Sequence, residues 1–126
     1  MPSLEIDAEA EAPPQMGTLV WLLDPVFGFF VWAAHFLIVY IATAVACVLG
    51  LGEAGAGVQS AFLTGLGVVT AVSAGILVLH AVWRYRQQRG VPAHRFRVSV
   101  TAGGDAIATV AILLQFFPIL MVPLCA

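Results

Sequence analysis

The sequence predicts an all-α integral membrane protein with three transmembrane helices. Hydrophobic residues make up 61% of the 126 residues and charged residues only 10%, whereas a soluble domain carries about 25% charged residues. The charges are also segregated, because every basic residue other than histidine lies in one short segment between two long apolar runs. This basic loop contains Arg84, Arg86, Arg89, Arg95 and Arg97. It is short and interrupted by Gly90 and Pro92, which argues against nucleic-acid binding.

The chain divides into a tail and a membrane domain. Residues 1–20 are acidic, contain two adjacent prolines and show no sustained apolar period, which predicts a flexible N-terminal tail. Residues 21–126 form the predicted three-helix transmembrane domain, with spans at about 25–51, 58–83 and 98–124. Each span exceeds the roughly 20 residues that cross a bilayer core. Asp24 is the predicted N-cap of the first span, with Pro25 in its first turn.

The basic loop predicts the orientation of the spans. Short arginine-rich loops stay on the cytoplasmic side of a membrane. Three spans then place the N-terminus in the cytoplasm and the C-terminus in the periplasm, in a multi-pass protein of the bacterial inner membrane. Cys47, near the outer end of the first span, and Cys125, at the outer end of the third, fall on the same side.

Three interpretations of the two cysteines stay open. The outer side of a bacterial membrane is oxidising, which favours a disulfide between Cys47 and Cys125. They could instead be separate buried thiols, because free cysteine packs as a small apolar residue. A third reading makes them copper ligands with Met121 nearby, since thiolate and thioether suit Cu(I).

Polar residues inside the spans are candidates for function, because an ionisable group in a membrane is costly. The estimated depths of His35 and Asp105 agree best, so we predict that these two residues pair. The pair would be either an element of a proton relay or a structural hydrogen bond between helices. His80 is expected nearer the inner surface. Tyr40 lies past the middle of the first span, and its hydroxyl needs a partner, which another helix could supply.

Small residues recur at four-residue spacing along the second span. Such spacing lets helix backbones approach closely in lipid, so this face is a predicted helix-packing surface; the alternative is that glycine and alanine are simply common in membrane helices. The residues are Ala61, Gly65, Gly67, Ala71 and Gly75.

The two ends of the membrane domain resemble a known group of proteins. The first span carries Trp32, His35, Tyr40 and Cys47 in a W-x-x-H-x-x-x-x-Y-x-x-x-x-x-x-C pattern, and the chain ends in FFPILMVPLCA. This is similar to small, uncharacterised, three-span proteobacterial membrane proteins encoded near haem-copper cytochrome c oxidase genes. The resemblance implies a non-catalytic accessory subunit of a cytochrome c oxidase or a related respiratory complex, with larger integral membrane subunits and lipids as partners.

Two other functions stay open at this stage. One is a membrane assembly or copper-handling factor that uses Cys47 and Cys125. The other is a small transporter or proton-conducting oligomer that uses His35 and Asp105. The sequence contains no Ser-His-Asp set, metal-spaced histidine cluster or P-loop, so we expect no enzymatic activity, no metal site and no cofactor.

Overall fold

Three long helices form an up-down-up bundle. The structure is a computed structural model that describes residues 22–88, 90, 92 and 95–125. Its helices are α3 (Phe27–Val48), α4 (Ala56–Gln88) and α5 (Arg95–Met121). All three are long and apolar enough to cross a membrane, as the composition predicts. The predicted tail, residues 1–20, lies outside the described residues.

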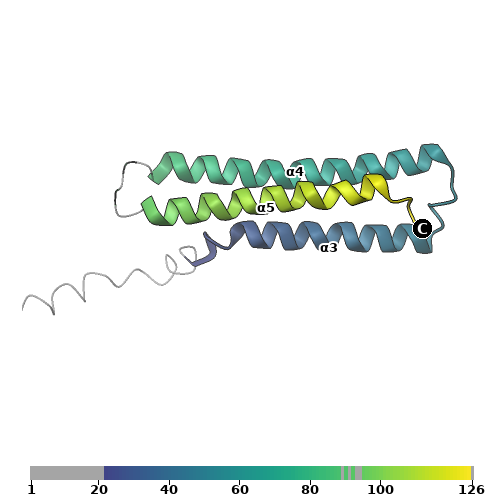
Figure 1. Cartoon of the computed structure of the whole chain (residues 1–126), viewed down its shortest axis with the longest axis horizontal. Helices are drawn as coiled ribbons and strands as arrows, with labels where there is room; N and C mark the ends of the chain where they lie inside the picture. The colour runs from purple at the N-terminus through teal and green to yellow at the C-terminus, as the bar shows by residue number, and fades with distance from the viewer. Residues whose placement is uncertain (1–21, 89, 91, 93–94, 126) are drawn as a thin grey trace, which may run out of the picture.

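Helix α5 is the central element of the bundle. It packs against both α3 and α4, which contact one another less (Figure 1). The buried apolar core consists of Leu77 from α4 with Ala108 and Ile112 from α5. Phe27, Val31 and Trp32 of α3 pack against this core. Helix α5 therefore holds α3 and α4 together.

The helices next to the basic loop are longer than predicted. Helix α4 continues past Trp83 to Gln88, and α5 begins at Arg95 rather than at residue 98. Arginine has high helix propensity, and its long side chain can carry the charge away from an apolar surface. Arg84, Arg86, Arg95 and Arg97 therefore belong to helix ends rather than to a loop, while Arg89 lies outside the described residues.

The start of α3 differs from the prediction. Val26 is the N-cap residue and makes no side-chain capping bond. Asp24 instead lies in the turn that precedes the helix and directs its carboxylate towards Arg84 of α4. The prediction of Asp24 as the N-cap was wrong because an arginine on a neighbouring helix offers the carboxylate a charged donor, which forms a stronger hydrogen bond than a neutral backbone N–H.

Helices α3 and α5 come closest at Gly28. A Cβ atom built on Gly28 would lie 2.8 Å from Asp105 Oδ1, 3.2 Å from Asp105 Cα and 3.2 Å from the carbonyl oxygen of Gly104. A Cβ on Gly104 would lie 3.4 Å from the carbonyl oxygen of Pro25. Glycine at these positions brings the two backbones together, which is how helices associate closely in lipid.

Candidate functional site

A disulfide closes one end of the bundle. Cys47, in the last turn of α3, is bonded to Cys125, which follows α5, and their Cα atoms are 5.4 Å apart. A Cβ atom on Gly52 would lie 2.9 Å from the carbonyl oxygen of Leu124, so the turn after α3 packs tightly against the end of the chain. The predicted disulfide is therefore present. With both sulfurs in this bond, neither is a thiolate that could bind copper in this state.

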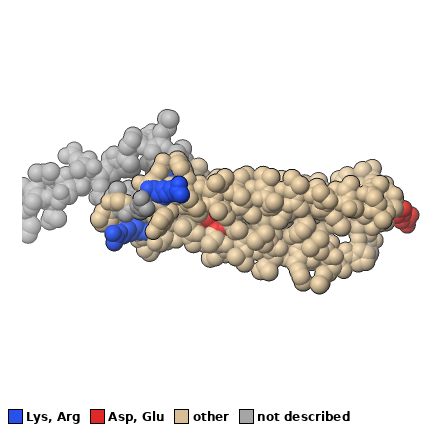
Figure 2. All heavy atoms as spheres, turned by 90° about the horizontal axis from the view of Figure 1, so that it is seen from above, with Lys and Arg blue, Asp and Glu red and all other residues tan. Residues whose placement is uncertain are grey.

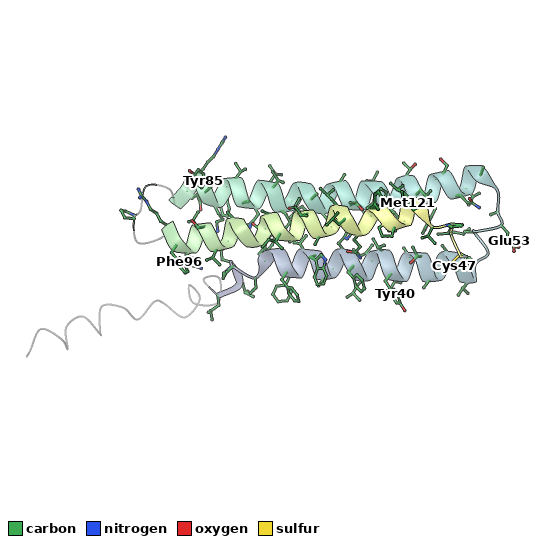
Figure 3. The ribbon with its side chains drawn as sticks, in the orientation of Figure 1. Tyr40, Cys47, Glu53, Tyr85, Phe96 and Met121 are labelled. Carbon is green, nitrogen blue, oxygen red and sulfur yellow. A yellow bond between two sulfur atoms is a disulfide. The ribbon has the colours of Figure 1, made fainter. Side chains whose placement is uncertain are left out.

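The basic residues and the disulfide lie at opposite ends of the molecule. Figure 2 shows the described arginines gathered at one end, and Figure 3 shows Cys47 and Glu53 at the other. This is the arrangement that the sequence predicts for two sulfurs on the side away from the basic segment. Which end faces the cytoplasm stays a prediction based on the arginines.

A group of charged side chains joins α4, α5 and the turn before α3 near the arginine end. We call it the acid–base cluster, and it consists of Asp24, His80, Arg84, Arg97 and Asp105. Asp24 comes from the turn before α3, His80 and Arg84 from α4, and Arg97 and Asp105 from α5. Asp105 is 2% exposed, and no member is more than 17% exposed.

His80 lies at the centre of the acid–base cluster, between two carboxylates. Its Nδ1 is 2.7 Å from Asp105 Oδ2, and its Nε2 is 3.5 Å from Asp24 Oδ1. A neutral imidazole can donate from only one nitrogen, whereas an imidazolium can donate from both. The 2.7 Å contact is a hydrogen bond with Asp105, whereas the 3.5 Å contact places a second carboxylate, that of Asp24, beside Nε2 without a hydrogen bond.

Asp24 is held by the two arginines of the acid–base cluster. Arg84 Nε donates to Asp24 Oδ1 at 2.8 Å, and a second nitrogen of the same guanidinium contacts Oδ2. Arg97 Nη2 is 3.9 Å from the same oxygen. Two carboxylates therefore face two guanidinium groups and one imidazole. Paired charges of this kind avoid most of the cost that an isolated charge would incur in a buried position.

The predicted pairing of His35 with Asp105 was wrong, because each residue has a different partner. His35 Nε2 lies 3.0 Å from Thr70 Oγ1, while Asp105 is paired with His80. The prediction compared depths counted from assumed helix starts. In the structure Asp105 lies beside Gly28, which precedes His35 by two helical turns, or about 10 Å. Counting from the true ends of α4 and α5 would have placed His80 and Asp105 within about one turn of each other.

His35 and Thr70 form a second polar contact deeper in the bundle. Thr70 Oγ1 donates to the carbonyl oxygen of Leu66 at 2.9 Å, so His35 Nε2 is the donor in the contact with Thr70. His35 is 1% exposed, and its Nδ1 is left as a buried acceptor without a hydrogen bond. Gln115 Oε1, on α5, is likewise buried without a hydrogen bond. The His35–Thr70 contact therefore connects α3 and α4 inside the membrane domain.

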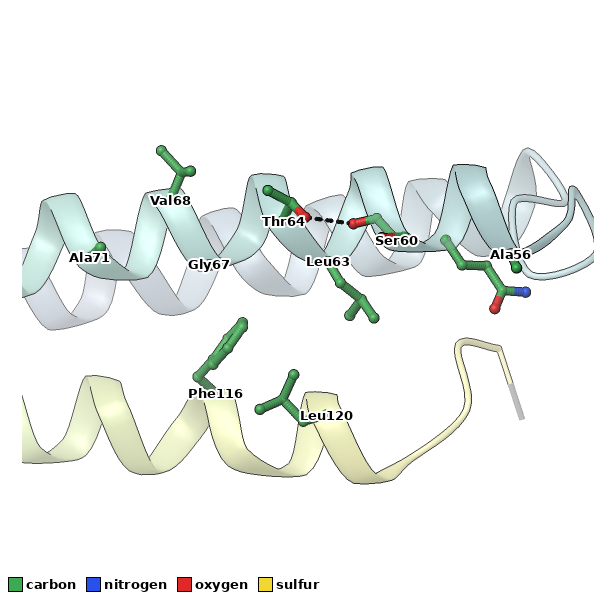
Figure 4. A pocket seen from close by; sticks show the side chains of 10 residues that line it. Ala56, Ser60, Leu63, Thr64, Gly67, Val68, Ala71, Phe116 and Leu120 are labelled. Atoms are coloured by element: carbon green, nitrogen blue, oxygen red, sulfur yellow. Dashed lines mark hydrogen bonds between the residues drawn. The ribbon is translucent and has the colours of Figure 1, made fainter.

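The predicted helix-packing surface on α4 makes few contacts with the rest of the chain. A Cβ on Gly67 would lie 3.6 Å from Phe116 of α5, whereas Gly65 and Gly75 have nothing within 4 Å of such an atom. Gly67 and Ala71 line an open, mostly apolar groove of about 670 Å³ between α4 and α5 (Figure 4). Ala61 is also exposed. Contact of this surface with a helix of another protein stays a prediction.

Comparison with known proteins identifies no similar protein. No family model, curated protein or solved structure matches the chain. Among the described residues, no three histidine, cysteine or acidic side chains are grouped so that they could hold a metal ion. The acid–base cluster is therefore the candidate site that the structure itself provides.

Proposed function

We propose that this chain is a non-catalytic accessory subunit of a membrane energy-converting complex, most simply a cytochrome c oxidase or a related respiratory complex. The observation that carries this proposal is the difference between the polar contacts inside the bundle and its apolar outer surface. The polar side chains of the acid–base cluster and of the His35–Thr70 contact are largely buried and bind the chain's own helices to one another. The outer surface presents large apolar side chains along all three helices, which suits contact with lipid and with other transmembrane helices.

The respiratory part of the proposal rests on the sequence. The pattern of Trp32, His35, Tyr40 and Cys47, followed by the proline-rich end, is similar to proteins encoded near oxidase genes. The disulfide adds support, because it gives a covalent closure to the end of the bundle that we assign to the oxidising periplasm. It also counts against a copper-handling role, in which the thiolates would have to be free.

The test is purification of the tagged chain from native membranes in a mild detergent. We expect larger integral membrane subunits to co-purify in a fixed ratio, together with the reduced-minus-oxidised haem spectrum of an oxidase. A small three-span protein of unrelated sequence with the same tag is the control for non-specific capture. A discrete homo-oligomer free of other subunits would contradict the proposal.

A second function, movement of protons by an oligomer, is favoured by one observation. His80 faces carboxylates on both sides at a buried position, and intramembrane groups of this kind mark proton pathways in transporters. Proton uptake by proteoliposomes that contain the purified chain would test it. Flux that is lost in His80→Asn but kept in His35→Asn would favour this function, whereas equal leakage of all three preparations would exclude it.

A further inference from the structure

Among the described residues, Thr101 of α5 differs from the other threonines. Thr43, Thr64, Thr70 and Thr109 each donate to a backbone carbonyl three or four residues earlier, which is a common bond for threonine in a helix. Thr101 is 2% exposed, and its Oγ1 has no hydrogen-bond partner within the described part of the chain. A buried hydroxyl without a partner is unfavourable, so Thr101 indicates a site for a molecule that can bond to it.

The register of the helices places Thr101 inside the acid–base cluster. Thr101 precedes Asp105 by four residues on α5, so both residues lie on the same helix face, one turn apart. Asp105 is paired with His80 of α4, and Arg84 follows His80 by one turn on that helix. Because α4 and α5 run in opposite directions (Figure 1), Thr101 is level with Arg84. The carboxylate of Asp24, which Arg84 binds, lies at the same level.

Two hydrogen-bond acceptors face each other in this part of the cluster. His80 Nδ1 bonds to Asp105, so in the neutral ring that donates from Nδ1 the other nitrogen, Nε2, is an acceptor. Nε2 lies 3.5 Å from Asp24 Oδ1, which also only accepts. A water molecule has two hydrogens, and from about 2.8 Å it can donate one to each of these atoms. It can also accept the proton of Thr101, which gives the water three partners, the usual number for a buried water.

The cluster is open towards the arginine end and closed on its other side. His80 and Arg97 remain 14% and 17% exposed, so a water molecule can reach the cluster from that end. One turn past His80, the apolar core of Leu77, Ala108 and Ile112 begins. Leu77 and Ile112 are fully buried, and a water molecule among these side chains would have no polar partner. A route for water therefore ends at this core.

We infer that the acid–base cluster binds a water molecule between Thr101, His80 and Asp24, and that this water exchanges protons between His80 and the solvent at the arginine end. A proton that arrives through the water binds Nε2, after which the ring donates from both nitrogens; its release restores the neutral ring. The exchange takes place from one side only, because the apolar core closes the route. This inference goes beyond the accessory function and holds whether or not the chain joins a complex.

Solid-state NMR of the full chain, in vesicles of phosphatidylethanolamine and phosphatidylglycerol, tests the water site directly. The experiment measures the transfer of proton magnetisation from water to each ¹³C-labelled threonine Cβ. Thr70 is the matched control, because it is 4% exposed but its hydroxyl bonds to its own backbone. Transfer to Thr101 should be about three times faster than transfer to Thr70, since a bound water lies against its hydroxyl. The variants Thr101→Val and Thr70→Val assign the two signals, and equal transfer rates would overturn the inference.

The link between this water and His80 is tested with ¹⁵N-labelled histidine. Thr101→Val should lower the transfer from water to His80 Nε2 by about twofold, because the water loses one of its three partners. Thr109→Val is the control on the same helix, since its hydroxyl bonds to the carbonyl oxygen of Asp105, and it should leave this transfer unchanged. The His80 Nδ1 signal reports that the contact with Asp105 is intact in both variants. Unchanged transfer to Nε2 in Thr101→Val would overturn the proposed exchange.

The stability of Thr101→Val distinguishes a bound water from a hydroxyl that is simply unpaired. If the hydroxyl bonds to water, its replacement by a methyl group removes a favourable contact, and the variant should unfold at a lower SDS fraction than the wild type. If the hydroxyl has no partner, the same replacement removes the cost of burying it. Unfolding of Thr101→Val at a higher SDS fraction than the wild type would therefore overturn the inference.

Discussion

Replacing Gly28 by alanine tests whether the close crossing of α3 and α5 positions the acid–base cluster. The added methyl group would lie 2.8 Å from Asp105 Oδ1, and within 3.2 Å of two backbone atoms of α5. The carboxylate cannot simply turn aside, because Asp105 is 2% exposed and its other oxygen is bonded to His80. The two helices must therefore move apart, which weakens the His80–Asp105 contact as well as the packing.

The expected loss follows from comparison with a glycine that has free space around it. Gly65→Ala is the control, because nothing lies within 4 Å of a Cβ atom there, and alanine in a helix is favoured over glycine by about 0.5–1 kcal/mol. Overpacking costs about 1–3 kcal/mol, so Gly28→Ala should lose about 1–2 kcal/mol net of that gain. The two variants should thus differ by about 1.5–3 kcal/mol in the free energy of unfolding.

Reversible unfolding in mixed micelles, with increasing SDS and tryptophan fluorescence as the signal, measures this difference. Gly28→Ala should unfold at a lower SDS fraction than the wild type, and Gly65→Ala at the same fraction or a higher one. A Gly28→Ala protein as stable as Gly65→Ala would refute the reasoning, because it would mean that the two backbones do not approach each other as closely as the structure shows.

Three further results are expected from the contacts inside the bundle. The wild type should resist maleimide labelling until a reductant is added, and labelling without reductant would contradict the disulfide. The double variant Cys47→Ser, Cys125→Ser should lower the free energy of unfolding by at most about 4.5 kcal/mol, the loop-closure value for a 78-residue separation. His80→Ala should destabilise the chain by about 3–5 kcal/mol, since it leaves the buried carboxylate of Asp105 unpaired. A double-mutant cycle in SDS unfolding should show a smaller loss when Asp105→Asn is already present. Thr70→Val removes one membrane hydrogen bond and should cost only about 0.6 kcal/mol by the same assay; a loss above about 3 kcal/mol would assign a larger role to the His35 contact.

The spans, the disulfide and the separation of arginines from sulfurs could all be predicted from the sequence. Each depends on a property that is visible along the chain: the length of an apolar run, the position of the charges, and the number of membrane crossings between two residues. Cys47 and Cys125 had to fall at the same end of the bundle once three spans were assigned. No knowledge of which helix faces touch was needed for these predictions.

The polar contacts could not be predicted in the same way, because they depend on the register between helices. Helix α5 begins three residues earlier than its apolar run indicates, and Gly28 brings Asp105 to the start of α3. Position alone predicts that Asp24 caps the first helix, whereas its hydrogen-bond donor Arg84 lies 60 positions later in the chain. Spacing along one helix identifies polar residues that share a face, but it does not identify the residue opposite them.

The positions of the internal contacts bear on how the chain would join a larger complex. In lipid, helices are not driven together by expulsion of water, so a small bundle depends on close packing and on polar or covalent contacts. This chain has such contacts at three levels: the acid–base cluster, the His35–Thr70 contact and the disulfide. Each contact involves α3 or the turn that leads into it. These contacts hold the bundle together from within, so that it would present an already ordered surface to a partner, and little conformational entropy has to be lost when the complex forms.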